Sequence, residues 1–396
     1  MTILRGNDLL SKNQCNALRG IAIIGIFLHN FCHWLSPKVV IIENEYNFSI
    51  SLSQRMWEYL TGGNIDMYFP VQFFSFFGHY GVPIFLFLSG FGLVLKYEGP
   101  NSEKSSATQF IVYQWKKLFR LMLLGLVVGL FSHAVYNAFY QEDWLKHLIA
   151  QLLLVINMLR KPELNIMPGP YWFFGLMLEV YVIYRLIIYP THNIKNRRWK
   201  WLKWFMPVVL VLVTWLMQEP LINQPERLRF WRYNAVVAML PFAIGVLMAR
   251  YGFPHLPKWS LATIAITALV VLMLANLNFH AWLWGQLVVI AGSVSFVKLF
   301  EARNSNIQNC LNLTIKPLVW TGALSSCIFV THPLVRLPIF MEVIWKLRVG
   351  LTPQFYLWII IYIVLTLLLA MGYKYYLELY PAPRLKTKNN LKCIKC

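Results

Sequence analysis

An arginine and two histidines lie in the first apolar segment of the chain: Arg19, His29 and His33. Ionisable side chains are costly inside a membrane and usually serve a function there. At 1.5 Å per residue, His29 lies roughly 15 Å beyond Arg19 along a helix, about half the hydrocarbon thickness. His33 follows one turn later on the same face. A neutral imidazole near the bilayer middle is suited to take a proton from a hydroxyl. The alternative is a histidine that only packs against a neighbouring helix.

The second apolar segment combines glycines with an internal proline: Gly81, Pro83 and the pair Ser89-Gly90. Proline leaves one backbone carbonyl without its helical partner, and glycine lets another helix or a ligand approach closely. Such interruptions are tolerated where they line a cavity. The pattern therefore predicts either a channel wall or close packing between helices.

Other polar residues lie at the start of, or inside, later apolar segments. Lys117 and Arg120 are three residues apart and share a helix face, where anionic lipid or a phosphorylated ligand would account for them. Glu179, preceded by Trp172, and His332 each indicate a site only weakly. Histidines and carboxylates do not occur together at the spacing of metal ligands, so we predict no metal site.

Composition places all of these residues in a membrane protein. Of the 396 residues, 58% are hydrophobic and 13% charged, whereas soluble domains have about 25% charged residues. The formal net charge of +20 fits basic cytoplasmic loops facing anionic lipid, so we expect no nucleic-acid partner. Apolar stretches are spread evenly, which predicts one membrane-embedded domain over residues 1–396. Its core covers 17–381, and 382–396 form a basic cytoplasmic tail.

A transmembrane helix needs about 20 apolar residues, and eleven stretches are candidates. They fall near 18–36, 69–95, 110–133, 144–159, 171–190, 205–219, 233–250, 261–279, 281–300, 317–340 and 355–378. Basic residues at both ends of the chain place both termini in the cytoplasm, which requires an even number of spans. The segment 144–159 is short and polar, and we interpret it as interfacial or re-entrant. The expected fold is an all-α transmembrane bundle of about ten spans.

In this order, the motifs resemble the acyltransferase-3 family of bacterial membrane O-acyltransferases. The first-helix arginine and histidine, the Gly81 to Gly90 stretch, and the basic pair opening the third helix all resemble family elements. So do Trp172 with Glu179, and His332 before a proline. The resemblance covers about residues 16–381. It implies a ten-helix bundle that transfers an acyl group, usually acetyl from coenzyme A, to an envelope or exported carbohydrate.

Two positions depart from the family pattern. The family arginine and histidine usually bracket ten residues, but nine separate Arg19 from His29. At 100° per residue, His29 therefore points about 80° away from Arg19, His33 about 40°, and Asn30 about 20°. Either the helix contains a local irregularity such as a π-bulge, or Arg19 and His29 meet different partners. Lys117 stands where the family prefers arginine, which keeps the charge but loses bidentate geometry.

The resemblance implies a role for each residue in an inner-membrane enzyme. His29 is expected to act as general base or acyl relay, and Arg19, Lys117 and Arg120 to bind the phosphates of acyl-coenzyme A. Gly81, Ser89 and Gly90 would shape the acyl channel, with Ser89 and Gly90 on the donor side. His33, Asn30, Gly81, Glu179, Trp172 and His332 would contact the acceptor. The rival hypothesis is a transporter or flippase of lipid-linked glycans, although no paired halves with matching interruptions are evident. The sequence does not indicate an oligomeric state.

Overall fold

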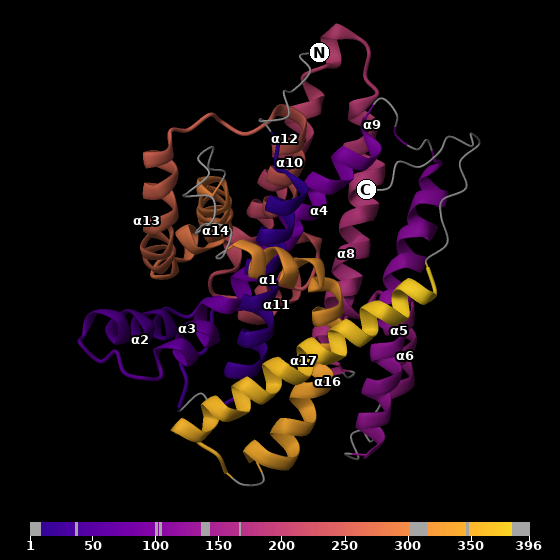
Figure 1. Cartoon of the computed structure of the whole chain (residues 1–396). Coiled ribbons are helices and arrows are strands. Elements are labelled where there is room, and N and C mark those ends of the chain that lie inside the picture. The colour runs from indigo at the N-terminus through magenta and orange to yellow at the C-terminus, as the bar shows by residue number, and fades with distance from the viewer. Residues whose placement is uncertain are drawn as a thin grey trace.

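The computed structural model describes residues 9–35, 39–99, 102, 105–135, 143–165, 168–300, 315–345 and 348–381. All regular elements within these ranges are helical (Figure 1). The α-helices that build the bundle are α1 (Lys12–Cys32), α2 (Ile50–Thr61), α3 (Phe69–Phe77), α4 (Gly81–Tyr97), α5 (Ala107–Val135), α6 (Trp144–Leu152), α7 (Pro162–Asn165), α8 (Trp172–Ile183), α9 (Tyr189–His192), α10 (Leu202–Gln218), α11 (Pro225–Arg232), α12 (Ala235–Tyr251), α13 (Lys258–Asn276), α14 (Phe279–Leu299), α16 (Ser325–Ile339) and α17 (Pro353–Leu379). Residues 315–323 are helical as well.

Eight helical segments of the described chain are long and apolar enough to cross a membrane, or nine if α11 and α12, bent by 46°, form one broken span. Helix α5 has 29 residues, with three cations in its first half, and its length is also enough to cross. Helix α6 has nine residues, about 14 Å, which is too short. The chain is thus a multi-pass helical bundle, and the count of ten spans and the side of the termini stay predictions.

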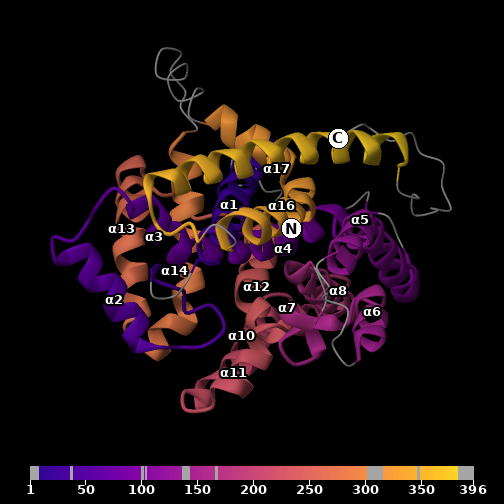
Figure 2. The same cartoon turned by 90° about the horizontal axis from the view of Figure 1, so that it is seen from below.

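Helix α1 lies at the centre of the bundle. It begins with a capping box in which the Ser11 hydroxyl accepts from the Gln14 backbone and the Gln14 side chain accepts from the Ser11 backbone. Cβ atoms on Gly20 and Gly322 would collide with the backbone of Leu318 and Asn16, so α1 and residues 315–323 are in close contact. Seen from below, α17 and α11 lie at opposite edges of the bundle, with α1, α4 and α12 between them (Figure 2).

Helix α4 continues α3 through a 3-10 turn at Gly78–Tyr80 and makes one segment from Phe69 to Tyr97. The two glycines Gly90 and Gly245 let α4 and α12 pack backbone to backbone, because a Cβ on either would lie about 2 Å from a carbonyl oxygen of the other helix. At the far end of α4, Glu98 accepts two 2.8 Å hydrogen bonds from Arg250. This buried pair joins α4 to α12, and the attraction between the two charges offsets part of the cost of burying them.

The bundle has two ends, which we name after residues of α1. At the Arg19 end, Arg250 of α12 joins Glu98 to the backbone of Lys203 in the first turn of α10. At the His29 end, the segment after α1 contacts α11, because the Glu45 carbonyl accepts from Arg232. The hydroxyl of Tyr356, at the start of α17, donates to the Met67 carbonyl at the same end.

Candidate active site

His29 lies in the last turn of α1 and is 3% exposed. Its Nδ1 is 3.2 Å from the carbonyl oxygens of both Phe74 and Ser75 on α3. A ring nitrogen facing two acceptors must carry the proton, so Nδ1 donates and Nε2 keeps its lone pair. The structure therefore orients His29 with its basic nitrogen away from α3.

A second histidine extends this arrangement. The Nδ1 of His33 is 2.9 Å from the His29 carbonyl, and the two rings stack with centroids 4.5 Å apart. The predicted stacking of His33 one turn beyond His29 is confirmed. Helix α1 is regular from Lys12 to Cys32, so the alternative of a π-bulge between Arg19 and His29 is wrong. Arg19 and His29 instead point to different partners, as the angle between them requires.

Two glutamates after α1 approach these histidines. The Oε2 atom of Glu45 lies 3.9 Å from Nε2 of His29. Burial, together with the neighbouring charge of Glu43, raises the pKa of the Glu45 carboxyl to about 8. Ligand atoms of His29, His33 and Glu43 lie within 4.8 Å of one another, which is close enough to hold a metal ion. The spacing argument against a metal site missed this set, because Glu43 reaches the histidines only through the fold.

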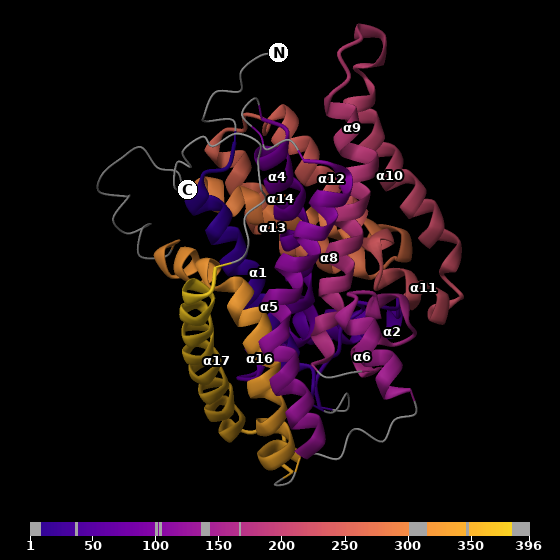
Figure 3. The same ribbon diagram turned by 90° about the vertical axis from the view of Figure 1, so that its right-hand side faces the viewer.

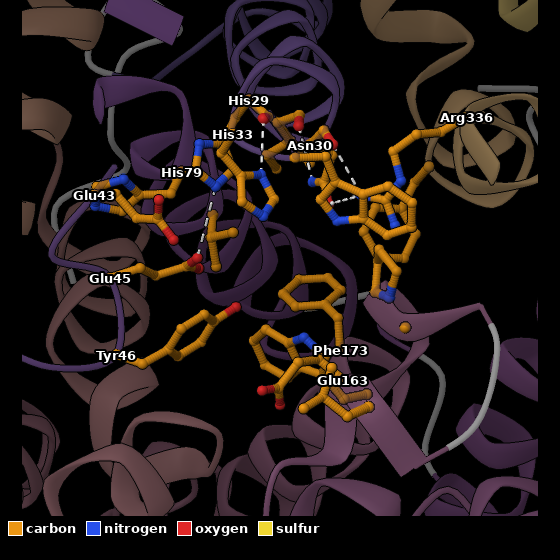
Figure 4. A pocket seen from close by; sticks show the side chains of 18 residues that line it. His29, Asn30, His33, Glu43, Glu45, Tyr46, His79, Glu163, Phe173 and Arg336 are labelled. Carbon is orange, nitrogen blue, oxygen red and sulfur yellow. Dashed lines mark hydrogen bonds and ion pairs between the residues drawn. The ribbon is translucent and has the colours of Figure 1, made fainter. Parts of the chain in front are cut away.

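A cavity of about 200 Å³ opens beside these side chains (Figure 4). His29, His33 and His79 lie on one side of it, Glu43, Glu45 and Tyr46 beside them, and Glu163 and Phe173 opposite. His79 comes from the 3-10 turn between α3 and α4, and neither of its ring nitrogens has a hydrogen-bond partner among the described residues. The cavity is lined by Ile26, His29, Asn30, His33, Trp34, Glu43, Glu45, Tyr46, His79, Val82, Glu163, Leu164, Gly169, Pro170, Trp172, Phe173, Phe329 and Arg336.

Arg336 of α16 brings a buried cation to the cavity wall. It is 3% exposed, and its Nη1 donates 2.9 Å hydrogen bonds to the backbone and side-chain oxygens of Asn30. Its guanidinium carbon lies 3.7 Å from the centroid of the Trp34 ring, a cation–π contact. These contacts hold the cation in place without a carboxylate partner among the described residues, so its charge is available to an anion in the cavity.

A separate basic group lies near the Arg19 end. Lys117 lies close enough to Lys96 and Arg19 for their positive charges to repel it. Tyr181 lies near both Arg19 and Ser89. The structure thus brings Arg19, Lys117 and Ser89 into one region. Arg120 turns away, because its Nη2 donates a 2.7 Å hydrogen bond to the Leu377 carbonyl on α17.

A family model described as an acyltransferase domain matches residues 13–375, nearly the whole chain. The chain belongs to the acyltransferase-3 family. No curated protein and no solved structure matches it significantly. Membership makes the chain an acyltransferase, and the cavity around His29 is its candidate active site.

Three of the expected acceptor contacts line the cavity of the acyltransferase, namely His33, Asn30 and Trp172, and three do not. Gly81 packs α4 against α1, since a Cβ there would lie 2.2 Å from the Ala22 carbonyl oxygen. Glu179 accepts a 2.7 Å hydrogen bond from the Ala235 backbone and so caps the start of α12. His332 is fully buried, with Nδ1 3.1 Å from the Ile328 carbonyl.

The glycines of α4 require a correction. We expected Gly81 and Gly90 to shape an acyl channel, but both face the backbone of a neighbouring helix and leave no space there. The alternative of close helix packing holds for both positions. Their lack of a Cβ lets α1, α4 and α12 approach closely enough to position the residues around the cavity.

Several residues of the acyltransferase's cavity were missed from the sequence: His79, Glu43, Glu45, Tyr46, Glu163 and Arg336. His79 falls within the glycine-rich stretch and had a visible signal, an ionisable residue inside an apolar segment. Arg336 lies one turn after His332 and had the same signal. The glutamates had none, because acidic residues between spans are ordinary on the non-cytoplasmic side.

Proposed function

We propose that this acyltransferase transfers an acyl group, acetyl first, from coenzyme A to a hydroxyl of a cell-envelope or exported carbohydrate in the bacterial inner membrane. The observation that supports this is the orientation of His29. Two backbone carbonyls hold its Nδ1–H, and Nε2 faces a cavity large enough for part of a sugar. A general base needs this free lone pair within reach of the acceptor hydroxyl.

In the proposed step, Nε2 of His29 takes the proton of the acceptor hydroxyl while the oxygen attacks the thioester carbonyl. The tetrahedral intermediate collapses, the carbon–sulfur bond breaks, and the coenzyme A thiolate leaves with the proton from His29. Arg336 offers a buried positive charge to the oxyanion that develops during attack. If His29 instead carries the acyl group as a relay, the same nitrogen forms the covalent bond.

The orientation of the bundle in the membrane supports separate binding sites for the donor and the acceptor, one at each end of the bundle. By the charge bias of the loops, the Arg19 end faces the cytoplasm, where coenzyme A is found. Arg19 and Lys117 would bind its phosphates there. Arg120 would contribute less, because its guanidinium already donates a hydrogen bond to the Leu377 carbonyl. The thioester would reach along α1 toward His29, roughly 15 Å away. The acceptor would enter from the His29 end.

The test uses the full chain purified in nanodiscs with radiolabelled acetyl-coenzyme A. We expect saturable binding of the donor, and slow release of free coenzyme A thiol when water replaces the acceptor. Comparing envelope glycans by mass spectrometry with and without the gene should show O-acetyl groups lost from one glycan. A flippase of lipid-linked glycans would bind no coenzyme A and would leave acetylation unchanged, so that pair of results would reject the proposal.

A further inference from the structure

A second cavity, of about 480 Å³, lies next to the first at the His29 end. One wall is the segment between α6 and α7, and the other is α11 with the turn before it; Figure 3 shows α6 and α11 near the same end of the bundle. We call it the basic groove. Its lining residues are Arg160, Lys161, Leu221, Glu226, Arg227, Arg229, Phe230, Trp231 and Tyr233.

Cations outnumber carboxylates in the basic groove. Of its four cations, Arg229 is paired with Glu163, and Arg227 donates a 2.9 Å hydrogen bond to the neutral side chain of Gln224. Arg160 and Lys161 are exposed and have no carboxylate partner among the described residues. Glu226 is the one carboxylate of its lining. The groove therefore offers excess positive charge to a ligand.

This charge is unusual for its position. Lysine and arginine concentrate in the cytoplasmic loops of membrane proteins, and the same bias places the His29 end on the opposite side. Lys161 also has a φ of +49°, a left-handed conformation that costs a non-glycine residue of order 1 kcal/mol or more. A basic segment on the non-cytoplasmic side is therefore a candidate site for an anionic ligand.

The basic groove adjoins the cavity around His29. Glu163 lines the His29 cavity and its ion-pair partner Arg229 lines the groove. Likewise, Tyr46 lines the cavity and stacks on Tyr233 of the groove, with ring centroids 4.3 Å apart. These two contacts form a shared wall. A ligand held in the groove can therefore place a neighbouring unit beside His29.

Three aromatic residues complete the groove: Phe230, Trp231 and Tyr233. Aromatic side chains offer flat apolar faces, and Tyr and Trp add a polar edge. Such faces suit the C–H faces of sugar rings, and arginines beside them suit carboxylate or phosphate oxygens. Lipid headgroups would use the charges, but a lipid site would not need to adjoin the His29 cavity.

We propose that the basic groove binds a carboxylate or phosphate group of the acceptor, so that the acceptor is an anionic carbohydrate. The anionic unit lies in the groove, and the sugar that receives the acyl group lies next to it in the His29 cavity. This inference rests on the proposed function, because it takes the bound carbohydrate to be the acyl acceptor. Binding in the groove can nevertheless be measured without acyl transfer.

The experiment compares two probes on the full chain in phosphatidylcholine nanodiscs. One is an oligosaccharide of galacturonic acid, and the other is the same oligosaccharide with its carboxyls methyl-esterified. Isothermal titration calorimetry should detect binding of the acid and much weaker binding of the ester. The double variant Arg160→Gln/Arg227→Gln should weaken binding of the acid by about tenfold, and the loss should shrink at high salt.

The matched control is Arg197→Gln/Arg198→Gln, which removes two exposed arginines at the Arg19 end. It should bind the acid as the unmodified protein does, and thermal unfolding should show both double variants folded. Equal binding of acid and ester, no binding of the acid, or an equal loss in the control would overturn the proposal. So would a loss of bound phosphatidylglycerol as the sole effect of Arg160→Gln/Arg227→Gln in anionic nanodiscs, since the groove would then be a lipid site.

The two proposals can fail separately. His29→Gln should lower acyl transfer by roughly 10²–10⁴-fold and should still bind the acidic oligosaccharide far better than its methyl ester, because the residues of the basic groove are unchanged. If the unmodified protein binds the oligosaccharide but never binds acetyl-coenzyme A, the proposed function is wrong and the anion site stands. If it binds the donor but not the acidic oligosaccharide, the groove proposal alone is wrong.

Discussion

The basic nitrogen of His29 faces a carboxyl group across 3.9 Å, the distance from Nε2 to Oε2 of Glu45. The two residues come from different elements, one from the last turn of α1 and the other from the segment that follows it. When His29 takes a proton it becomes a cation, and an ionised Glu45 at this distance would stabilise it. The protonation of Glu45 should therefore control the strength of the base.

The first prediction is a pH dependence. Because its pKa is raised to about 8, Glu45 is mainly protonated below that pH and ionised above it. The rate of acyl transfer should rise as the pH increases through about 8, where the anion appears beside His29. Glu45→Gln should remove this rise and lower the rate at pH 9 by about tenfold or more. A stopped assay of coenzyme A release from pH 6 to 9.5 measures both effects, and an unchanged profile in Glu45→Gln would reject this role.

The second prediction concerns the choice between neighbouring polar residues of α1. His29→Ala should lower acyl transfer by roughly 10²–10⁴-fold, the range for a lost general base. His33→Ala should lower the rate less, because His33 lines the cavity next to His29 but does not occupy the position of the base. The control His280→Ala removes an exposed histidine paired with Glu219 and should keep full activity. An active His29→Ala with an inactive His33→Ala would move the base to His33. An active His29→Ala with an inactive Asn30→Ala would show that His29 is not the base and that Asn30, which accepts from Arg336, is essential in another way.

The third prediction concerns the donor. Lys117→Ala should raise the KM for acetyl-coenzyme A more than the KM for the acceptor. The ratio of the donor KM of the variant to that of the unmodified enzyme should fall as salt rises, because salt also screens the contact that the unmodified enzyme retains. Arg120→Ala should have a smaller effect on KM, because its guanidinium is bonded to Leu377. Steady-state kinetics at two salt concentrations measure this. An equal loss with a truncated acetyl thioester that lacks the nucleotide phosphates would show that Lys117 does not bind phosphate.

The fourth prediction separates base catalysis from metal catalysis. The ligand atoms of His29, His33 and Glu43 lie close enough for Zn²⁺, and bound zinc would occupy the lone pair that the base needs. Added Zn²⁺ should inhibit transfer, a chelator should restore it, and Glu43→Gln should weaken the inhibition. A chelator alone should leave the untreated enzyme fully active. Activity lost to the chelator and regained with zinc would instead make the ion part of the mechanism.

The fifth prediction tests topology. Asn196 lies at the Arg19 end and Leu164 at the His29 end, and both side chains are exposed. In a background without native cysteines, a cysteine at position 164 should react with an impermeant thiol reagent in intact cells. A cysteine at position 196 should react only after lysis, because the basic run around it favours the cytoplasm. Labelling of position 196 in intact cells would reverse the side of these loops, and with it the expected side of the donor.

Much of the fold could be predicted from local patterns. Apolar stretches of about 20 residues predicted the long helices, because a membrane or a membrane-protein core requires them. The boundaries were less certain: α1 begins at Lys12 and ends at Cys32, not at 18–36, because the Ser11 capping box extends it into polar sequence. The glycines of α4 were compatible with a channel wall or with close helix packing. Only the positions of α1 and α12 in the structure show that these glycines serve close packing.

For the site, the sequence by itself determined the family, the membrane class and the histidine pair, since residues four apart on one helix stack wherever that helix lies. Only the tertiary structure decided what surrounds the pair. Glu45 reaches His29 because the segment after α1 folds back against α11, and Arg336 reaches Asn30 across 306 residues of chain. Such contacts depend on the packing of whole helices and leave no periodic signal in the sequence. The tautomer of His29, and so its ability to act as a base, likewise depends on two carbonyls of α3 that no spacing within α1 could reveal.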